Sequence, residues 1–264
     1  MRATRRGRVR AEARTAGIGW IDAGLPVPGA RAGTTTRQGG ASEGPYASFN
    51  LGDHVGDDPD AVARNRALLA RALALPGEPL WLRQVHGTAV VVHGECAAAP
   101  TADAAVALGP GRVLAVLTAD CLPVVLAARD GSRIGLAHAG WRGLAAGVVE
   151  ATVAALGLPG SALIAWIGPG IGAEDFEVGA EVRASFVNPD PGATTAFRAN
   201  ARGRWQGDLG ALARRRLAAL GVEAAGGVAA STCADAGRFY SYRRERTTGR
   251  MATLAWLSPR PGRD

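Results

Sequence analysis

The chain has 264 residues, 47% of them apolar, which is enough for a hydrophobic core and excludes a wholly disordered protein. The formal net charge is +7. The first 16 residues hold six arginines and one glutamate and so contribute +5 of it. The remainder is close to neutral, which argues against nucleic acid as the partner of the folded part.

Three regions are predicted along the chain: a basic flexible tail over residues 1–17, a single catalytic domain over 18–258 and a second tail over 259–264. No segment has the length of a clean apolar membrane span, since the most apolar run, 113–128, carries Asp120 and Pro123. Three cysteines form an odd and sparse set, which argues against a disulfide framework and for the reducing cytoplasm. We expect a monomer.

The first predicted helix runs from Pro59 to about Leu73. Asp58 is a typical N-cap, and proline is favoured in the first turn. Residues 80–85 and 89–92 have the composition of strands and flank a turn at His86 and Gly87.

The rest of the chain alternates apolar runs with glycine-bounded helical patterns. We predict strands over 112–119, 122–128, 133–137, 162–167 and 250–257, and helices over 144–156 and 208–220. Gly157 and Gly221 follow the two helices as C-caps, and Asp208 caps the second. Because there is no regular βαβ rhythm, the pattern favours an α+β fold or an α/β sandwich over a doubly wound sheet.

Two of the four histidines, His86 and His138, lie in short glycine-flanked segments beside predicted strands. Cys121 precedes a third strand. The strands 122–128 and 133–137 flank Asp130 and Gly131, a hairpin-type turn. If Arg129 pairs with Ser132, Cys121 and His138 are diagonal neighbours on one face, with backbones roughly 7–8 Å apart. A register shift of one residue would break this argument.

A thiolate and two imidazoles are suitable ligands for zinc, and three protein ligands are typical of a catalytic site. Two other interpretations use the same residues. Cys121 could be a buried structural cysteine beside two hydrogen-bonded histidines. Alternatively, Cys121 and His138 could form a thiolate–imidazolium pair for acyl transfer, for which Asp120 is a poor orienting group because its side chain points to the opposite strand face.

The segment after His138 has the features of an anion site. Gly140 and Gly143 permit a tight turn, a helix start clusters free N–H groups, and Arg142 adds a fork of donors. A glycine turn with a solvated arginine fits the same residues.

Nine motifs in this order resemble the YfiH/YlmD family, whose members are also called laccase-domain or peptidoglycan-editing-factor proteins. The resemblance spans residues 33–257. The motifs are TTTRQGG (34–40), FNLG (49–52), NR (65–66), QVHG (84–87), TADCLP (118–123), HAGWRG (138–143), IGP (167–169), FEVG (176–179) and FYSYRR (239–244).

The resemblance implies a compact α/β sandwich similar to the cysteine hydrolases of the deamidating-toxin type. It implies Zn²⁺, with copper as the alternative metal, on His86, Cys121 and His138, which are also the expected catalytic residues. The implied reaction is phosphorolysis of purine nucleosides, namely adenosine, inosine and methylthioadenosine, with a secondary adenosine deaminase activity. The substrate contacts we expect are Arg37, Asn50, Arg66, Arg142 and Arg243.

Two other activities are suggested by the family's labels. An amidase that edits a peptidoglycan precursor could use the same cysteine–histidine centre, and the sequence does not separate it from a phosphorylase. The histidine content argues against a copper phenol oxidase, because four histidines cannot build a three-copper cluster and a blue copper site.

Overall fold

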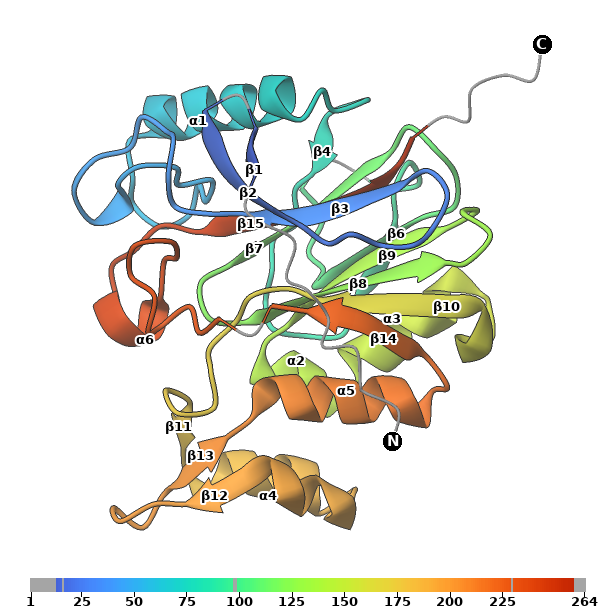
Figure 1. The fold of residues 1–264 in the computed structure, drawn as a ribbon, viewed down its shortest axis with the longest axis vertical. Helices are drawn as coiled ribbons and strands as arrows, with labels where there is room; N and C mark the ends of the chain where they lie inside the picture. The colour runs from blue at the N-terminus through green and yellow to red at the C-terminus, as the bar shows by residue number, and fades with distance from the viewer. Residues whose placement is uncertain (1–12, 16, 97–98, 229, 259–264) are drawn as a thin grey trace, which may run out of the picture.

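A computed structural model of the protein describes residues 13–15, 17–96, 99–228 and 230–258. Two six-stranded sheets pack face to face and carry helices on both outer surfaces (Figure 1). The predicted α/β sandwich is confirmed. None of the helices in these residues is long and apolar enough to cross a bilayer.

The last strand of the chain lies in the middle of the first sheet, between two earlier strands. The strand order is β1 (Ala13–Thr15), β2 (Ile18–Asp22), β3 (Ala30–Thr35), β15 (Met251–Leu257), β7 (Val113–Thr118) and β4 (Pro79–Leu80). The second sheet has the order β14 (Glu223–Gly227), β10 (Leu163–Ile167), β8 (Leu122–Ala128), β9 (Ile134–Ala139), β6 (Ala104–Ala107) and β5 (Val90–Val92).

Helix α1 (Pro59–Ala72) covers the outer face of the first sheet, and α2 (Trp141–Ala146), α3 (Val148–Leu156) and α5 (Leu209–Ala219) cover that of the second (Figure 1). A small third sheet of β11 (Glu177–Val178), β13 (Trp205–Gly207) and β12 (Phe197–Ala199) packs with α4 (Ala180–Val187) and projects from the sandwich. The remaining short helices are α6 (Tyr242–Glu245), η1 (Gly44–Tyr46), η2 (Gly160–Ala162) and η3 (Pro191–Ala196).

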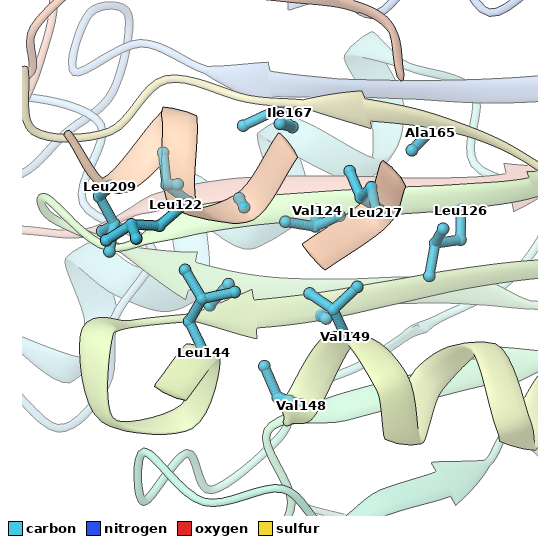
Figure 2. Packing of buried hydrophobic residues seen from close by; sticks show 14 of the residues in the cluster. Leu122, Val124, Leu126, Leu144, Val148, Val149, Ala165, Ile167, Leu209 and Leu217 are labelled. Atoms are coloured by element: carbon cyan, nitrogen blue, oxygen red, sulfur yellow. The ribbon is translucent and has the colours of Figure 1, made fainter. Parts of the chain in front are cut away.

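Strand β8 is buried on both faces, which explains its uninterrupted apolar sequence. Successive side chains of a strand point to opposite faces, so Val125 packs between the two sheets, while Val124 and Leu126 pack against the helices. Figure 2 shows the helix-facing side chains together with Leu144 and Val149. Strand β8 thus contributes to the core on both of its faces, and Cys121 directly precedes this tightly packed strand.

The predicted hairpin register is confirmed. Leu122 pairs with Ala139 and Pro123 with His138, so β8 and β9 are aligned as the turn at Asp130 and Gly131 predicts. The two caps are confirmed as well, since the side chains of Asp58 and Asp208 accept hydrogen bonds from backbone N–H groups at the starts of α1 and α5.

Two predicted elements differ in the structure. The helix predicted over 144–156 begins earlier, at Trp141, and Gly147 breaks it into α2 and α3 by adopting a φ of +102°. The strand predicted over 80–85 is limited to Pro79–Leu80. Beyond it Arg83 forms an isolated backbone bridge with Thr101, and the N–H of Val85 donates to the side chain of Asp103 and not to a neighbouring strand.

The predicted N-terminal tail needs one correction. Residues 13–15, which fall within the predicted tail over 1–17, form β1 and pair with β2. The other parts of the predicted tails, residues 1–12 and 259–264, lie outside the described residues.

Candidate functional site

Cys121 lies at the start of β8, directly after a residue with unusual backbone geometry. Asp120 has a φ of +92°, a conformation that non-glycine residues rarely adopt. Its carboxylate accepts hydrogen bonds from Thr232 Oγ1 and from the backbone N–H of Arg243, both at 2.7 Å. These contacts hold the turn that presents Cys121. They also confirm that Asp120 does not orient the histidines.

His138 lies on β9 and is 3% exposed. Its Nδ1 donates to Oδ1 of Asp103 at 2.9 Å, which fixes the ring orientation and leaves Nε2 to face Cys121 and His86. Asp103 is fully buried just before β6. The orienting carboxylate therefore comes from the residue just before β6 and not from the cysteine segment.

The same carboxylate also holds the loop that carries His86. Asp103 accepts backbone hydrogen bonds from Val85 at 3.2 Å, His86 at 2.8 Å and Gly87 at 2.6 Å. His86 itself has a φ of +60°, so its loop conformation needs this external support. Burial opposes ionisation of Asp103, but the hydrogen bonds from His138 and from the loop outweigh it and lower the pKa of the carboxyl.

The ligand atoms of His86, Cys121 and His138 all lie within 4.8 Å of one another. Cys121 Sγ is 3.8 Å from His86 Nε2. Around a tetrahedral zinc ion, with Zn–S of about 2.3 Å and Zn–N of about 2.0–2.1 Å, sulfur and nitrogen ligands are separated by about 3.6 Å. The three donors fit a metal ion of this kind, and a side chain at Gly140 would collide with two of them.

The charges of the three side chains are coupled. Desolvation disfavours the Cys121 thiolate, but the charge of His138 and hydrogen bonds from both imidazoles outweigh it and lower the pKa of Cys121 to about 6. Desolvation likewise disfavours charged His138, whereas the thiolate and Asp103 raise the pKa of His138 to about 9. Cys121 is therefore predisposed to be a thiolate at neutral pH, the form that binds metals and attacks carbon.

The three side chains open into a cavity of about 450 Å³, which is in the size range of small-molecule sites. Three arginines contribute to its lining, namely Arg142, Arg243 and Arg250. Aromatic surface comes from Trp141, Phe176 and Tyr242, and Tyr242 is 48% exposed. The cavity thus combines positive charge with flat apolar surfaces.

Two of the five expected substrate contacts line this cavity. Arg142 stacks on Trp141, 4.4 Å from the ring centroid. Arg243 donates to the backbone carbonyls of Asp175 and Glu177, which ties α6 to the projecting small sheet.

The other three expected contacts lie outside the cavity lining, Arg37 and Asn50 in loops and Arg66 on α1. Arg37 donates to the Ala47 carbonyl and stacks on Tyr240. Arg66 donates twice to the Leu51 carbonyl. Asn50 is fully buried and bonds to backbone groups of its own loop and of Arg250. Their side chains are used in holding loops together, so the structure gives no support to direct substrate contact.

Sequence reasoning missed three residues around the centre. Asp103 is a lone acid at the start of the apolar run Ala-Ala-Val-Ala, and an unpaired carboxylate in such a place was a usable signal. Arg250 lies directly before the last strand, where the sequence pattern indicates only the start of a strand. His54 also lines the cavity, and nothing in its sequence surroundings indicated this.

Known proteins resemble this chain over almost its whole length. A family described as multi-copper polyphenol oxidoreductase laccase matches residues 31–258. A purine nucleoside phosphorylase of Pseudomonas aeruginosa is 49% identical over 240 residues, covering 90% of this chain and 98% of that protein. The purine nucleoside phosphorylase YfiH of Escherichia coli is 48% identical over 234 residues, covering 88% and 96%. The chain belongs to the YfiH/YlmD family.

Solved structures of the YfiH/YlmD family have the same fold. YlmD from Geobacillus stearothermophilus superposes with a TM-score of 0.83 at 33% identity, covering 95% of this chain and 99% of that one. A Neisseria meningitidis protein superposes with a TM-score of 0.87 at 44% identity, covering 91% and 99%. The family predicted from the nine motifs is thereby confirmed.

Replacement of Asp103 by asparagine tests the role of its carboxylate. An amide cannot accept hydrogen bonds on both sides, so its NH₂ group must face either His138 Nδ1 or the N–H groups of Val85 and Gly87. We expect Asp103→Asn to weaken binding of a divalent metal by roughly 10- to 100-fold, as measured by competition with a chromophoric chelator. The control is Asp60→Asn, at an exposed position on α1. Equal metal affinity of Asp103→Asn and the unmodified protein would contradict this role.

Proposed function

We propose that the protein is a zinc-dependent purine nucleoside phosphorylase that acts on adenosine, inosine and methylthioadenosine. The observation that carries the proposal is the convergence of His86, Cys121 and His138 at a cavity lined by arginine and aromatic side chains. The names of the Pseudomonas and Escherichia relatives support the same reaction. The three free cysteines favour the reducing cytoplasm as its compartment.

The donor set favours zinc over copper as the metal. One thiolate and two imidazoles match the borderline-soft, tetrahedral preference of zinc, and three protein ligands leave such an ion one further position for water or substrate. A bound zinc supplies Lewis-acid chemistry at this centre. Phenol oxidation of the laccase type needs several copper sites, and the described residues offer a single group of three metal-binding side chains.

The proposed reaction exchanges one bond at the sugar for another. An oxygen of phosphate forms a bond to C1′ while the bond from C1′ to the base nitrogen breaks. The electron pair of that bond leaves with the base, which takes up a proton, and the pentose 1-phosphate is the second product. Positive side chains such as Arg142 suit the phosphate, and the exposed ring of Tyr242 suits the face of a purine.

A second candidate function uses the same residues without a metal. Cys121, His138 and Asp103 form a nucleophile–base–orienter series, and the pKa of the thiol is lowered to about 6. The sequence offered only Asp120 as an orienting group, and Asp120 cannot serve. Asp103 supplies that group, so this series suits acyl transfer. An amidase that edits a peptidoglycan precursor is therefore the alternative proposal.

Incubation with adenosine, with and without phosphate, separates the two proposals. A phosphorylase releases adenine and ribose 1-phosphate only when phosphate is present. We expect this activity to be lost in Cys121→Ala together with the bound zinc, whereas Cys96→Ala, at a free cysteine outside the cavity lining, retains both. Full activity in Cys121→Ala, or release of free ribose in the absence of phosphate, would refute the proposed phosphorolysis.

Deamination of adenosine is expected to be a slower, secondary activity. Zinc deaminases use a glutamate to move protons while water replaces the amino group at C6. No glutamate is among the described residues that line the cavity, and both oxygens of Asp120 already accept hydrogen bonds. With saturating phosphate, early samples should contain more adenine than inosine and hypoxanthine combined. The reverse order would make the protein chiefly a deaminase.

A further inference from the structure

Arg250 is the third arginine of the cavity. Few groups of the protein pair with the positive charge of its guanidinium. The residue lies directly before β15 and is half-buried. Its Nη1 donates to the carbonyls of Thr248 at 2.9 Å and Gly249 at 3.1 Å. Within the described part of the chain, Nε and Nη2 have no hydrogen-bond acceptor, and no carboxylate forms an ion pair with this guanidinium.

Three consecutive residues of the FNLG motif are arranged around Arg250. Asn50 Oδ1 accepts a hydrogen bond from the backbone N–H of Arg250 at 2.8 Å, and the N–H of Leu51 donates to the Arg250 carbonyl at 3.2 Å. A Cβ atom at Gly52 would lie 2.9 Å from Arg250 Cγ, so only glycine leaves room for this side chain. The motif does not line the cavity. It holds Arg250, which does line the cavity.

The surroundings of Arg250 favour an anion from outside the protein. Burial lowers the pKa of Arg250, an effect that the negative charges of Cys121 and Asp120 oppose. The carboxylate of Asp120 is already used by Thr232 and Arg243. Because a guanidinium stays charged in proteins, a partly desolvated one is stabilised when an anion binds it.

A second unpaired polar group belongs to Thr118, which also lines the cavity. Thr118 is 1% exposed, and its Oγ1 has no hydrogen-bond partner among the described residues. In the β7–β15 pairing it stands opposite Met251, the neighbour of Arg250 in the chain. Buried polar groups are rarely left unpaired, so this hydroxyl is a second indication of a ligand in the cavity.

We propose that Arg250 forms the subsite that binds inorganic phosphate as the co-substrate. The assignment of this anion as co-substrate rests on the proposed phosphorolysis, whereas the anion site itself does not. The planar fork of Arg250 suits two phosphate oxygens, and the FNLG motif holds it in place before phosphate arrives. Arg142, which is exposed and stacks on Trp141, is less fixed than Arg250.

The test combines direct binding with kinetics. Calorimetry measures the affinity of the unmodified protein, Arg250→Gln and Arg64→Gln for inorganic phosphate. We expect Arg250→Gln to lower this affinity, and to raise the KM for phosphate, on the order of 10- to 100-fold, as for the loss of a hydrogen bond to a charged group. The KM for adenosine and the zinc content should stay within about twofold, since a structural role alone would move all of these quantities together. Arg64 pairs with Asp58 on the surface of α1 and is the matched control.

Arg250→Lys keeps the proposal testable if Arg250→Gln does not fold. Lysine keeps the charge and loses the fork, so phosphate affinity should fall to an intermediate value while the melting temperature is unchanged. Unchanged phosphate affinity in a folded variant, or no phosphate binding by the unmodified protein, would overturn the subsite. Phosphate binding that requires Arg250, in a protein that does not cleave adenosine, would instead uphold the subsite and refute the phosphorylase.

Discussion

The buried carboxylate of Asp103 holds together two segments that the fold brings from different places. One is the loop of Val85, His86 and Gly87, which donates three backbone hydrogen bonds to it, and the other is the ring of His138 on β9. A buried carboxylate is costly unless it is fully hydrogen-bonded, and here four donors compensate it. The geometry of both histidines therefore depends on a residue that does not itself contact the cavity.

The order of the strands in the two sheets brings these residues together. The pairing of β8 with β9 sets Cys121 and His138 on one face, and β6 pairs with β9 so that Asp103 lies beside His138. The last strand, β15, lies in the middle of the first sheet, and Arg250, the residue just before it, lines the cavity. The pairing of these strands thus places the Cys121 thiol, the His138 imidazole and the Arg250 guanidinium around one cavity.

Much of this site could be predicted from local sequence signals. The turn at Asp130 and Gly131 gives the hairpin register, and the register brings Cys121 close to His138. The caps at Asp58 and Asp208 are equally local. Asp103 and Arg250 were missed because their roles come from contacts with residues distant in the sequence. The same holds for Asn50, where a conspicuous motif indicated substrate contact, although its side chain supports Arg250.

The central claim is that one zinc ion is bound by His86, Cys121 and His138. Anomalous diffraction from crystals of the full chain, recorded on both sides of the zinc absorption edge, tests it most directly. The account predicts one strong peak within bonding distance of Cys121 Sγ and of both Nε2 atoms, and this peak should fall sharply below the zinc edge. The absence of a peak at this position, or a peak there that persists below the zinc edge, would contradict it.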